Sequence, residues 1–479
     1  MAEEEKRTEG QELSKKLVFE IKNVWETIEP AELPEVEHFA ESYKEFLNRG
    51  KTERECTAYC MNVLKEKGFV SIENSGKIGP GSKIYQNIKG KALVFAIIGT
   101  QPIQNGINIV GAHVDSPRID LKTNPLYEDS GLAFFDTQYY GGIKYYQWTA
   151  IPLTMHGVVI RKDGVKQTIC IGEDDSDPVF TITDLLPHLA DEQLEKKASK
   201  VVEGEELDIL VGSEPYKDEK AADKVKLNIL RLLNEKYGMV EEDFASAEIE
   251  FVPAFKARDV GIDRSMIGAY GHDDKCCAFA AFSAALHCAE SKPIPEKTVL
   301  CLLTDKEEIG SIGNTGSESR FFENFIAFLA SKTMDHYTEI DLRLLLSKSA
   351  MLSADVNAAY DPTYGSVYDK RTASHFGKGI LLTKYTVHGG KFGGSDANAE
   401  FCQKVQSILN KNNIRWQYGG MGRVNKGGGG TIALYAANMG IEVLDCGIPV
   451  LSMHSPFEVI SKIDLYTTYK GYTAFMNDA

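Results

Sequence analysis

The stretch Thr298-Val-Leu-Cys-Leu-Leu303 is an apolar run that predicts a buried strand. Two adjacent carboxylates, Glu307 and Glu308, follow just beyond its end, ahead of the glycine-bearing stretch Ile309-Gly-Ser-Ile-Gly313. Because successive side chains on an extended backbone point to opposite sides, one carboxylate at a strand end can hold a metal while its neighbour addresses a water on that metal. In an acidic chain, the same pair can also be a solvated corner between a strand and a loop. The residues at the ends of the other predicted strands decide between these two interpretations of the pair.

Strands and helices alternate on both sides of this run. Before it we expect helices over 13–25, 36–46 and 52–67, and two strands, 92–98 and 107–110, that are buried on most sides. After residue 246 the expected order is strand 247–252, helix 275–288, strand 298–303, helix 318–330, strand 351–356, strand 380–387, helix 397–409, strand 444–451 and a last helix after residue 461. Alternation on this scale predicts an α/β fold with a mostly parallel sheet that is covered by helices on both faces.

The middle of the chain has a different pattern. Residues 126–182 predict short strands rich in aromatic and β-branched residues, with turn signals at Gly141-Gly142 and Asp163-Gly164. An acidic, lysine-rich segment over 191–223 and a helix over 221–237 follow. We interpret this region as a β-rich domain inserted into the α/β domain. The expected division is 1–125 for the first part of the α/β domain, 126–245 for the insertion and 246–479 for the second part.

Composition and charge exclude several classes of protein. The 479 residues contain 53 Lys and Arg against 69 Asp and Glu, a net charge of −16, whereas nucleic acid or an anionic membrane needs a basic surface. The nine cysteines are scattered and form no Cys-x-x-Cys pair, which favours free thiols in a reducing compartment. The start, Met1-Ala-Glu-Glu-Glu5, lacks the features of a signal peptide, and no apolar stretch is long enough to span a bilayer. We therefore expect a cytoplasmic protein.

Four further groups of polar residues stand next to predicted strands. They are Gly111-Ala-His-Val-Asp-Ser-Pro117, Tyr270-Gly-His-Asp-Asp-Lys275, Ser353-Ala-Asp-Val-Asn357 and Ser452-Met-His-Ser-Pro456. Each has an ordinary reading of its own: a lone His-x-Asp is more often structural, and two carboxylates can cap a helix N-terminus. In an open α/β sheet, however, ligands collect at the carboxyl ends of strands.

Taken together, the five groups predict a pair of divalent ions. They supply two imidazoles, His113 and His454, and several carboxylates, with no thiolate in an obvious ligand role. Asp115 lies two residues after His113 and could orient it by accepting its other ring proton. Imidazole favours zinc over magnesium, and carboxylates can bridge two ions.

The string Phe251-Val-Pro-Ala, followed by Ala257-Arg-Asp-Val-Gly-Ile-Asp-Arg-Ser-Met-Ile-Gly-Ala-Tyr-Gly-His-Asp-Asp-Lys275 and the groups above, resembles the aspartyl aminopeptidase and aminopeptidase I family of dinuclear zinc metallopeptidases. The match runs in order over nearly the whole chain and is closest to the bacterial members. The resemblance implies a catalytic α/β domain that is interrupted by a β-rich dimerisation domain. It also implies a tetrahedral homododecamer, built from dimers, with enclosed active sites.

The resemblance assigns a role to each metal-site residue. His113 and Asp355 would hold one ion, Glu308 and His454 the other, and Asp273 would bridge them, with a cis bond to Asp274. Two Zn²⁺ ions are expected, with Co²⁺ or Mn²⁺ as alternatives. They would activate a water and polarise the scissile carbonyl, while Glu307 acts as general base and passes the proton to the leaving amine. Asp115 and Asp274 would support the ligands from behind. Binding of the substrate's free α-amine to one ion would restrict cleavage to the first residue.

Residues for the substrate are less sharply defined. His188 resembles a family histidine that reaches into a neighbouring subunit's active site, although an ordinary loop histidine fits equally well. Lys384 falls near a family lysine associated with acidic substrate side chains, and Lys378 competes for that alignment. The loop Lys426-Gly-Gly-Gly-Gly-Thr431 predicts close backbone approach to the substrate, through Gly429 and Thr431 in particular.

The chain departs from the eukaryotic aspartyl-specific members at two places. These are Asp274-Lys275, where those proteins have Asn-Leu, and Phe392-Gly-Gly-Ser-Asp-Ala-Asn398, which replaces a segment that carries a tyrosine. Preference for acidic or neutral N-terminal residues therefore stays open, as do the metal in each site, the peptide length and the assembly. The leading hypothesis is a metal-dependent aminopeptidase acting on peptides. A dinuclear amidohydrolase or carboxypeptidase-type enzyme is an alternative, and a self-assembling scaffold with structural metals is an alternative of another class.

Overall fold

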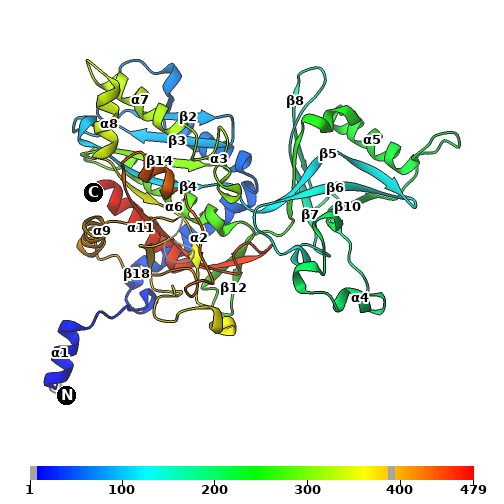
Figure 1. Ribbon diagram of the computed structural model, residues 1–479. Helices are drawn as coiled ribbons and strands as arrows, with labels where there is room; N and C mark the ends of the chain where they lie inside the picture. Colours follow the sequence, from blue (N-terminus) through cyan, green and yellow to red (C-terminus); the bar gives the residue numbers. More distant parts are fainter. Residues whose placement is uncertain (1–7, 387–393) are drawn as a thin grey trace.

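The apolar run at 298–303 forms β14 (Thr298–Thr304), a fully buried strand inside a nine-stranded sheet. The computed structural model describes residues 8–386 and 394–479 and has two lobes (Figure 1). The sheet of the α/β lobe has the order β1 (Val70–Ser71), β2 (Lys83–Ile88), β3 (Ala92–Ile97), β14, β4 (Ile107–His113), β15 (Ala350–Ser353), β19 (Glu442–Gly447), β17 (Ile380–Thr383) and β18 (Trp416–Tyr418).

Four adjacent strands at the centre of this sheet, β14, β4, β15 and β19, are parallel. Their register places Thr304 beside His113, and Ser353 beside both Gly111 and Asp445, so their carboxyl ends finish at the same edge. The sheet is mixed rather than uniformly parallel, because β2–β3, β3–β14 and β17–β19 are antiparallel pairs. The four parallel strands confirm the expected parallel arrangement at the centre of the sheet. The carboxyl ends of such strands are where ligands collect.

Helices cover both faces of the sheet, as the alternation predicts. Alternate residues of β14 divide between two hydrophobic cores: Val299, Cys301 and Leu303 face one, and Leu300 and Leu302 face the other. The first core is completed by α2 (Leu33–Arg49), α3 (Glu53–Glu66), α6 (His272–Glu290), α9 (Ala399–Lys411) and α11 (Lys462–Asp478). The second is completed by α7 (Phe321–Thr333), α8 (Glu339–Ser347) and α10 (Ala433–Asn438).

The second lobe is a seven-stranded antiparallel sheet with its own core. Its order is β8 (Lys166–Ile171), β7 (Leu153–Ile160), β11 (Glu248–Pro253), β5 (Arg118–Asp129), β6 (Leu132–Tyr140), β10 (Ile209–Gly212) and β9 (Thr181–Ile182), accompanied by α4 (Asp191–Leu194) and α5 (Lys224–Tyr237). The expected boundaries at 126 and 245 can be placed against the strands of this sheet. Residue 126 falls inside β5, and β11, which the sequence pattern assigned to the α/β domain, is a strand of this sheet.

A small third sheet is not apparent from the sequence. It has the order β12 (Arg258–Val260), β13 (Met266–Ala269), β21 (Glu458–Ser461), β20 (Pro449–Leu451) and β16 (Asn357–Ala358). The expected single strand over 444–451 is divided between β19 in the large sheet and β20 in this one. His454 therefore approaches the strand ends from the small sheet.

Two expected elements are shorter than the sequence pattern indicates. The helix over 13–25 is only α1 (Glu9–Leu17), which has no buried residue and lies apart from both lobes (Figure 1). The strand over 380–387 ends at Thr383. Val387, Phe392 and Gly393 lie outside the described residues. No helix within 8–386 or 394–479 has the length and apolar character that crossing a membrane requires.

Candidate active site

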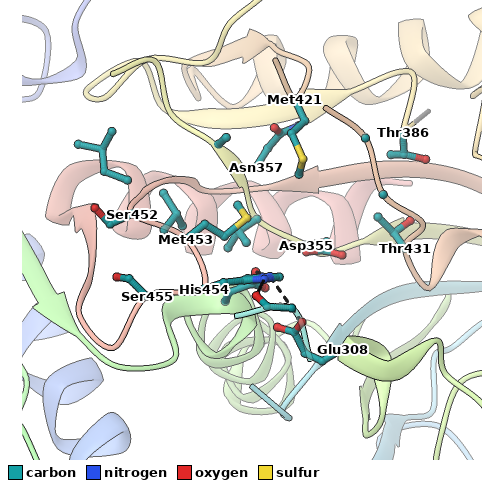
Figure 2. A pocket seen from close by; sticks show the side chains of 18 of the residues that line it. Glu308, Asp355, Asn357, Thr386, Met421, Thr431, Ser452, Met453, His454 and Ser455 are labelled. Carbon is teal, nitrogen blue, oxygen red and sulfur yellow. Dashed lines mark hydrogen bonds and ion pairs between the residues drawn. The ribbon is translucent and has the colours of Figure 1, made fainter. Parts of the chain in front are cut away.

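The carboxyl ends of the central strands open into a cavity of about 990 Å³. Figure 2 shows Glu308 and His454 pointing toward one another, with Asp355 beside them. Five of the six residues predicted for the metal site and its base line the cavity: Asp273, Glu307, Glu308, Asp355 and His454. The sixth, His113, is buried directly behind Asp273. The structure thus brings together side chains from β4, α6, the turn after β14, the segment after β15 and the loop after β20.

Asp273 stands between the two histidines. Its Oδ1 lies 3.3 Å from His113 Nε2 and its Oδ2 lies 3.1 Å from His454 Nε2, so each carboxylate oxygen faces one imidazole. Burial disfavours the Asp273 carboxylate, but hydrogen bonds from His113 and His454 outweigh burial and hold its pKa well below the usual value. The bond from Asp273 to Asp274 is cis, which confirms that expectation.

The remaining carboxylates divide between the two sides of Asp273. His113, Glu307 and Asp355 present ligand atoms that all lie within 4.8 Å of one another, and His113, Asp273 and Glu308 do the same. On the other side, His454 Nε2 lies 3.5 Å from Glu308 Oε2. Each side therefore has one imidazole and at least one carboxylate besides Asp273.

This donor set fits a pair of divalent cations. Burial, together with neighbouring acids, raises the pKa of both Glu308 and Asp355 well above the usual value. Glu308 Oε1 is buried and has no hydrogen-bond partner among the described residues. Crowded buried carboxylates need a compensating positive charge, and imidazole with carboxylate is a ligand set that zinc accepts.

Both histidines present Nε2 to the cluster because Nδ1 is occupied by a backbone carbonyl. His454 Nδ1 lies 2.7 Å from the carbonyl oxygen of Gly142, in the second lobe, and His113 Nδ1 lies 3.1 Å from that of Asp115. A carbonyl accepts but cannot donate, so each Nδ1 carries a proton. Hydrogen bonds to carboxylates outweigh burial and raise the pKa of both rings, so without an ion Nε2 is protonated as well and donates to Asp273, and a metal would take the place of that proton.

Asp115 organises more of the site than its place in the sequence indicates. Its Oδ1 lies 3.3 Å from His113 Nδ1, and its Oδ2 accepts a hydrogen bond from the Tyr140 hydroxyl at 2.8 Å. The backbone N–H groups of Glu307 and Glu308 also donate to its two oxygens, each at 3.1 Å. One buried carboxylate therefore positions the His113 imidazole and the glutamate pair.

The glutamate pair does not lie on extended backbone, which corrects the strand-end geometry expected from the sequence. Glu307 and Glu308 begin a 3-10 turn (Glu307–Ile309) between Lys306 at φ 68° and Gly310 at φ 94°. The turn, rather than strand alternation, separates the two side chains. Burial raises the pKa of Glu307 to about 7 against the opposing charge of His113. A carboxyl group with a pKa near neutrality can both take and return a proton.

Glu458 is a site residue that the sequence pattern did not reveal. It is buried on β21, where its Oε1 accepts the backbone N–H of His454 at 2.6 Å and its Oε2 accepts that of Asp273 at 3.0 Å. Burial and the charge of Asp273 raise the pKa of Glu458 to about 8. Asp274 has a similar supporting place, since its Oδ2 accepts the backbone N–H of His113 at 3.3 Å.

The glycine-rich loop reaches the cavity, where Gly429 and Thr431 are both lining residues. Thr431 Oγ1 donates to Asp445 Oδ1 at 2.6 Å, which anchors the loop to the end of β19. A Cβ atom at Gly427 would lie 2.2 Å from the Met421 carbonyl oxygen, whereas one at Gly429 would meet nothing within 4 Å. The loop thus needs glycine for its own packing at 427 and leaves open space at 429.

The other residues proposed for substrate lie outside the cavity. Lys384 Nζ is 3.5 Å from Asp396 Oδ1 and 4.7 Å from the ring centroid of Tyr385, and Lys384 is not among the described residues that line the cavity. Lys378 Nζ donates to the carbonyl of Ile21 at 2.9 Å. His188 is exposed in a 3-10 turn (Pro187–Leu189) of the second lobe.

Comparisons with known proteins identify relatives of the chain. A family model described as aminopeptidase I zinc metalloprotease (M18) matches residues 46–476. A probable M18 family aminopeptidase 1 of Clostridium acetobutylicum is 50% identical over 466 residues, which cover 96% of this chain and 99% of that relative. The crystal structure of an M18-family aminopeptidase from Thermotoga maritima has a TM-score of 0.92 at 43% identity, covering 96% and 100% of the two chains. The fold is also similar to the S. cerevisiae mApe1 dodecamer structure, with a TM-score of 0.74 at 22% identity over 91% and 95%.

Proposed function

The chain belongs to the M18 family of aminopeptidase I zinc metalloproteases, and from that premise we propose that its cavity removes the N-terminal residue of peptides with two divalent ions and Glu307 as general base. The observation that carries the proposal is the position of Asp273, whose two oxygens each face the Nε2 atom of a different histidine. A carboxylate that bridges two ions requires that arrangement.

The residues divide naturally between two ions. His113 and Asp355 would hold one, His454 and Glu308 the other, and Asp273 would contact both. Zinc is the favoured metal, given the imidazoles and the family. When bound, the pair of ions lowers the pKa of a water molecule and polarises the scissile carbonyl.

Glu307 carries the proton. Its carboxylate lies 3.8 Å from His113 Nε2 at the rim of the metal cluster, where it could accept a proton from the attacking water and return it to the leaving amine. Asp115 holds the backbone of Glu307 in place, so the base does not depend on a flexible loop. The substrate's α-ammonium group would be attracted by the carboxylates that surround Asp273.

The lining of the cavity favours a neutral first residue over an acidic one. Met421, Val450 and Leu451 line it, and the described lining holds one lysine, Lys144, together with Asp361. Lys384, which an acidic preference would require, is paired with Asp396 outside the described lining. We therefore place leucine and methionine ahead of aspartate and glutamate.

A blocked substrate tests the position of cleavage. Leucyl and N-acetyl-leucyl peptides of the same sequence should differ, because only the first has a free α-amine; the acetylated peptide should be resistant. Equal hydrolysis of both would favour the amidohydrolase or carboxypeptidase-type alternative. A chelator should remove activity and preserve the assembly, whereas a chelator that dissolves the assembly would favour the scaffold with structural metals.

We also propose a homododecamer built from dimers through the second lobe. One support is the similarity in fold to a relative whose structure is described as a dodecamer. A second is a group of exposed apolar side chains around His188: Leu185, Leu186, Leu189 and Leu194. Mass measurement of the native protein tests the assembly.

The nine cysteines, all in the described part of the chain, form no disulfide, which supports a cytoplasmic location.

A further inference from the structure

A second cluster of metal-ligand side chains lies where the two lobes meet. Glu55 comes from α3 of the α/β lobe, and His156 and Cys170 come from β7 and β8 of the second lobe. Their ligand atoms all lie within 4.8 Å of one another. None of the three lines the active-site cavity, and none has a part in peptide hydrolysis.

The sheet and the helix fix the geometry of this cluster. His156 and Cys170 are direct partners in the antiparallel β7–β8 ladder, so their side chains leave the same face of the sheet. Glu55 Oε2 accepts the backbone N–H groups of Lys51 and Thr52, each at 3.1 Å. That capping arrangement directs the other oxygen, Oε1, to His156 Nδ1 at 2.7 Å.

The far side of the His156 ring is arranged as in metal-bound histidines. Nε2 lies 3.1 Å from Glu173 Oε1 and 2.9 Å from Thr154 Oγ1. The Thr154 hydroxyl can donate to the Val252 carbonyl, and Glu173 is held by Lys51 Nζ at 2.9 Å, so both groups can accept a hydrogen bond from Nε2. A carboxylate that accepts a hydrogen bond from Nε2–H keeps the proton on that nitrogen and leaves the Nδ1 lone pair free for a metal.

We propose that Glu55 Oε1, His156 Nδ1 and Cys170 Sγ bind a further divalent ion, of the thiophilic class that includes Zn²⁺, and that this ion joins the two lobes. Thiolate and imidazole select zinc-like ions over magnesium or calcium. Cys170 is exposed whereas the other eight cysteines are buried, so an ion has access from solvent and water completes its coordination.

The distances and charges are compatible with binding. A tetrahedral zinc ion with bonds of about 2.0–2.3 Å keeps its ligand atoms roughly 3.3–3.6 Å apart, so Glu55 Oε1 and His156 Nδ1 need to separate by about 0.6 Å from 2.7 Å. Without metal, His156 is buried but hydrogen bonds to Cys170, Glu173 and Glu55 raise its pKa well above the usual value, so the ring is an imidazolium. Binding releases one proton from that ring and one from the thiol, and two protons exchanged for a divalent ion leave the net charge unchanged.

Cobalt spectroscopy on the full-length protein separates this site from the active site. The residues assigned to the active-site ions include no cysteine, so a near-ultraviolet thiolate-to-cobalt charge-transfer band should arise from the lobe junction. Titrating the metal-stripped protein with Co²⁺ should produce this band. Cys170→Ser should abolish the band and lower bound metal by one ion per subunit, without changing peptide hydrolysis. This difference does not depend on how many ions the active site holds.

Two further variants complete the test. Cys170→His should retain the additional ion but lose the sulfur band, and Thr168→Ser, at an exposed position on the same face of β8, should behave as wild type. Equal metal content in wild type and Cys170→Ser would overturn the proposal and leave the cluster as a metal-free network in which the His156 imidazolium joins Glu55 and Glu173. A sulfur band that survives Cys170→Ser would also overturn it, because another cysteine would then be the ligand.

Discussion

Replacing Asp115 with asparagine should damage the active site without altering any residue that touches the ions or the substrate. The Asp115 carboxylate takes the N–H groups of Glu307 and Glu308 at 3.1 Å each and faces His113 Nδ1 at 3.3 Å. Asparagine keeps one acceptor oxygen, but its NH2 group replaces the second oxygen and would face a backbone N–H group or the His113 ring nitrogen, neither of which can accept from it. Loss of one charge-assisted hydrogen bond should lower the free energy of unfolding by about 1.5–3 kcal/mol. Loss of the group that orients His113 should weaken metal binding by about 10–100-fold.

Asp243 provides a matched control for this substitution. It is a buried carboxylate in the second lobe that likewise accepts two backbone N–H groups, from Lys162 and Val240, each at 2.8 Å. Asp243→Asn should therefore lose similar stability but retain metal affinity. Metal affinity is measured by competition with a chromophoric chelator, and stability by urea unfolding of the metal-free protein. Wild-type metal affinity in Asp115→Asn would refute the role of Asp115 in orienting His113. An equal loss of metal affinity in Asp115→Asn and Asp243→Asn would show only a general effect of lost stability.

Three other predictions concern the ions, the loop and the substrate. Glu308→Gln should lower bound active-site metal by one ion per subunit in elemental analysis, because His454 loses its partner carboxylate; full metal content would remove Glu308 from the ligand set. Gly427→Ala should raise KM by at least about tenfold, since the new Cβ overlaps the Met421 carbonyl, whereas Gly429→Ala has free space and should lower activity only if the substrate approaches there. A panel of aminoacyl substrates should give kcat/KM at least about tenfold higher for Leu than for Asp. The reverse order would contradict this preference and support Lys384 as a residue that binds acidic side chains.

Much of the α/β lobe follows from local sequence. The short, mostly apolar runs that form β4 and β14 predict buried strands, and polar residues stand where each ends. The residue types and positions of His113, Asp273, Glu308, Asp355 and His454 predict one site, and the structure brings the five side chains together. Their roles as ligands come from the resemblance to known peptidases and stay predictions. Which carboxylate serves which ion depends on side-chain geometry that no spacing encodes.

What the sequence could not reveal depends on contacts between distant segments. Asp115 reaches Glu307 only because β4 and β14 pair in a register that sets His113 beside Thr304. Glu458 looks like any polar residue in a short strand until the fold brings two ligand backbones to it. Local propensity also cannot tell that the stretch 444–451, expected as one strand, is shared between β19 and β20, which belong to different sheets.

The metal content and turnover of Glu307→Gln test the central claim most directly. Glutamine keeps the size and the hydrogen-bonding oxygen of the side chain but cannot accept a proton from water. With both ions retained in elemental analysis, kcat for a leucyl peptide should fall by roughly 10²–10⁴-fold. Turnover close to wild type in the fully metal-loaded variant would contradict the assignment of Glu307 as the base.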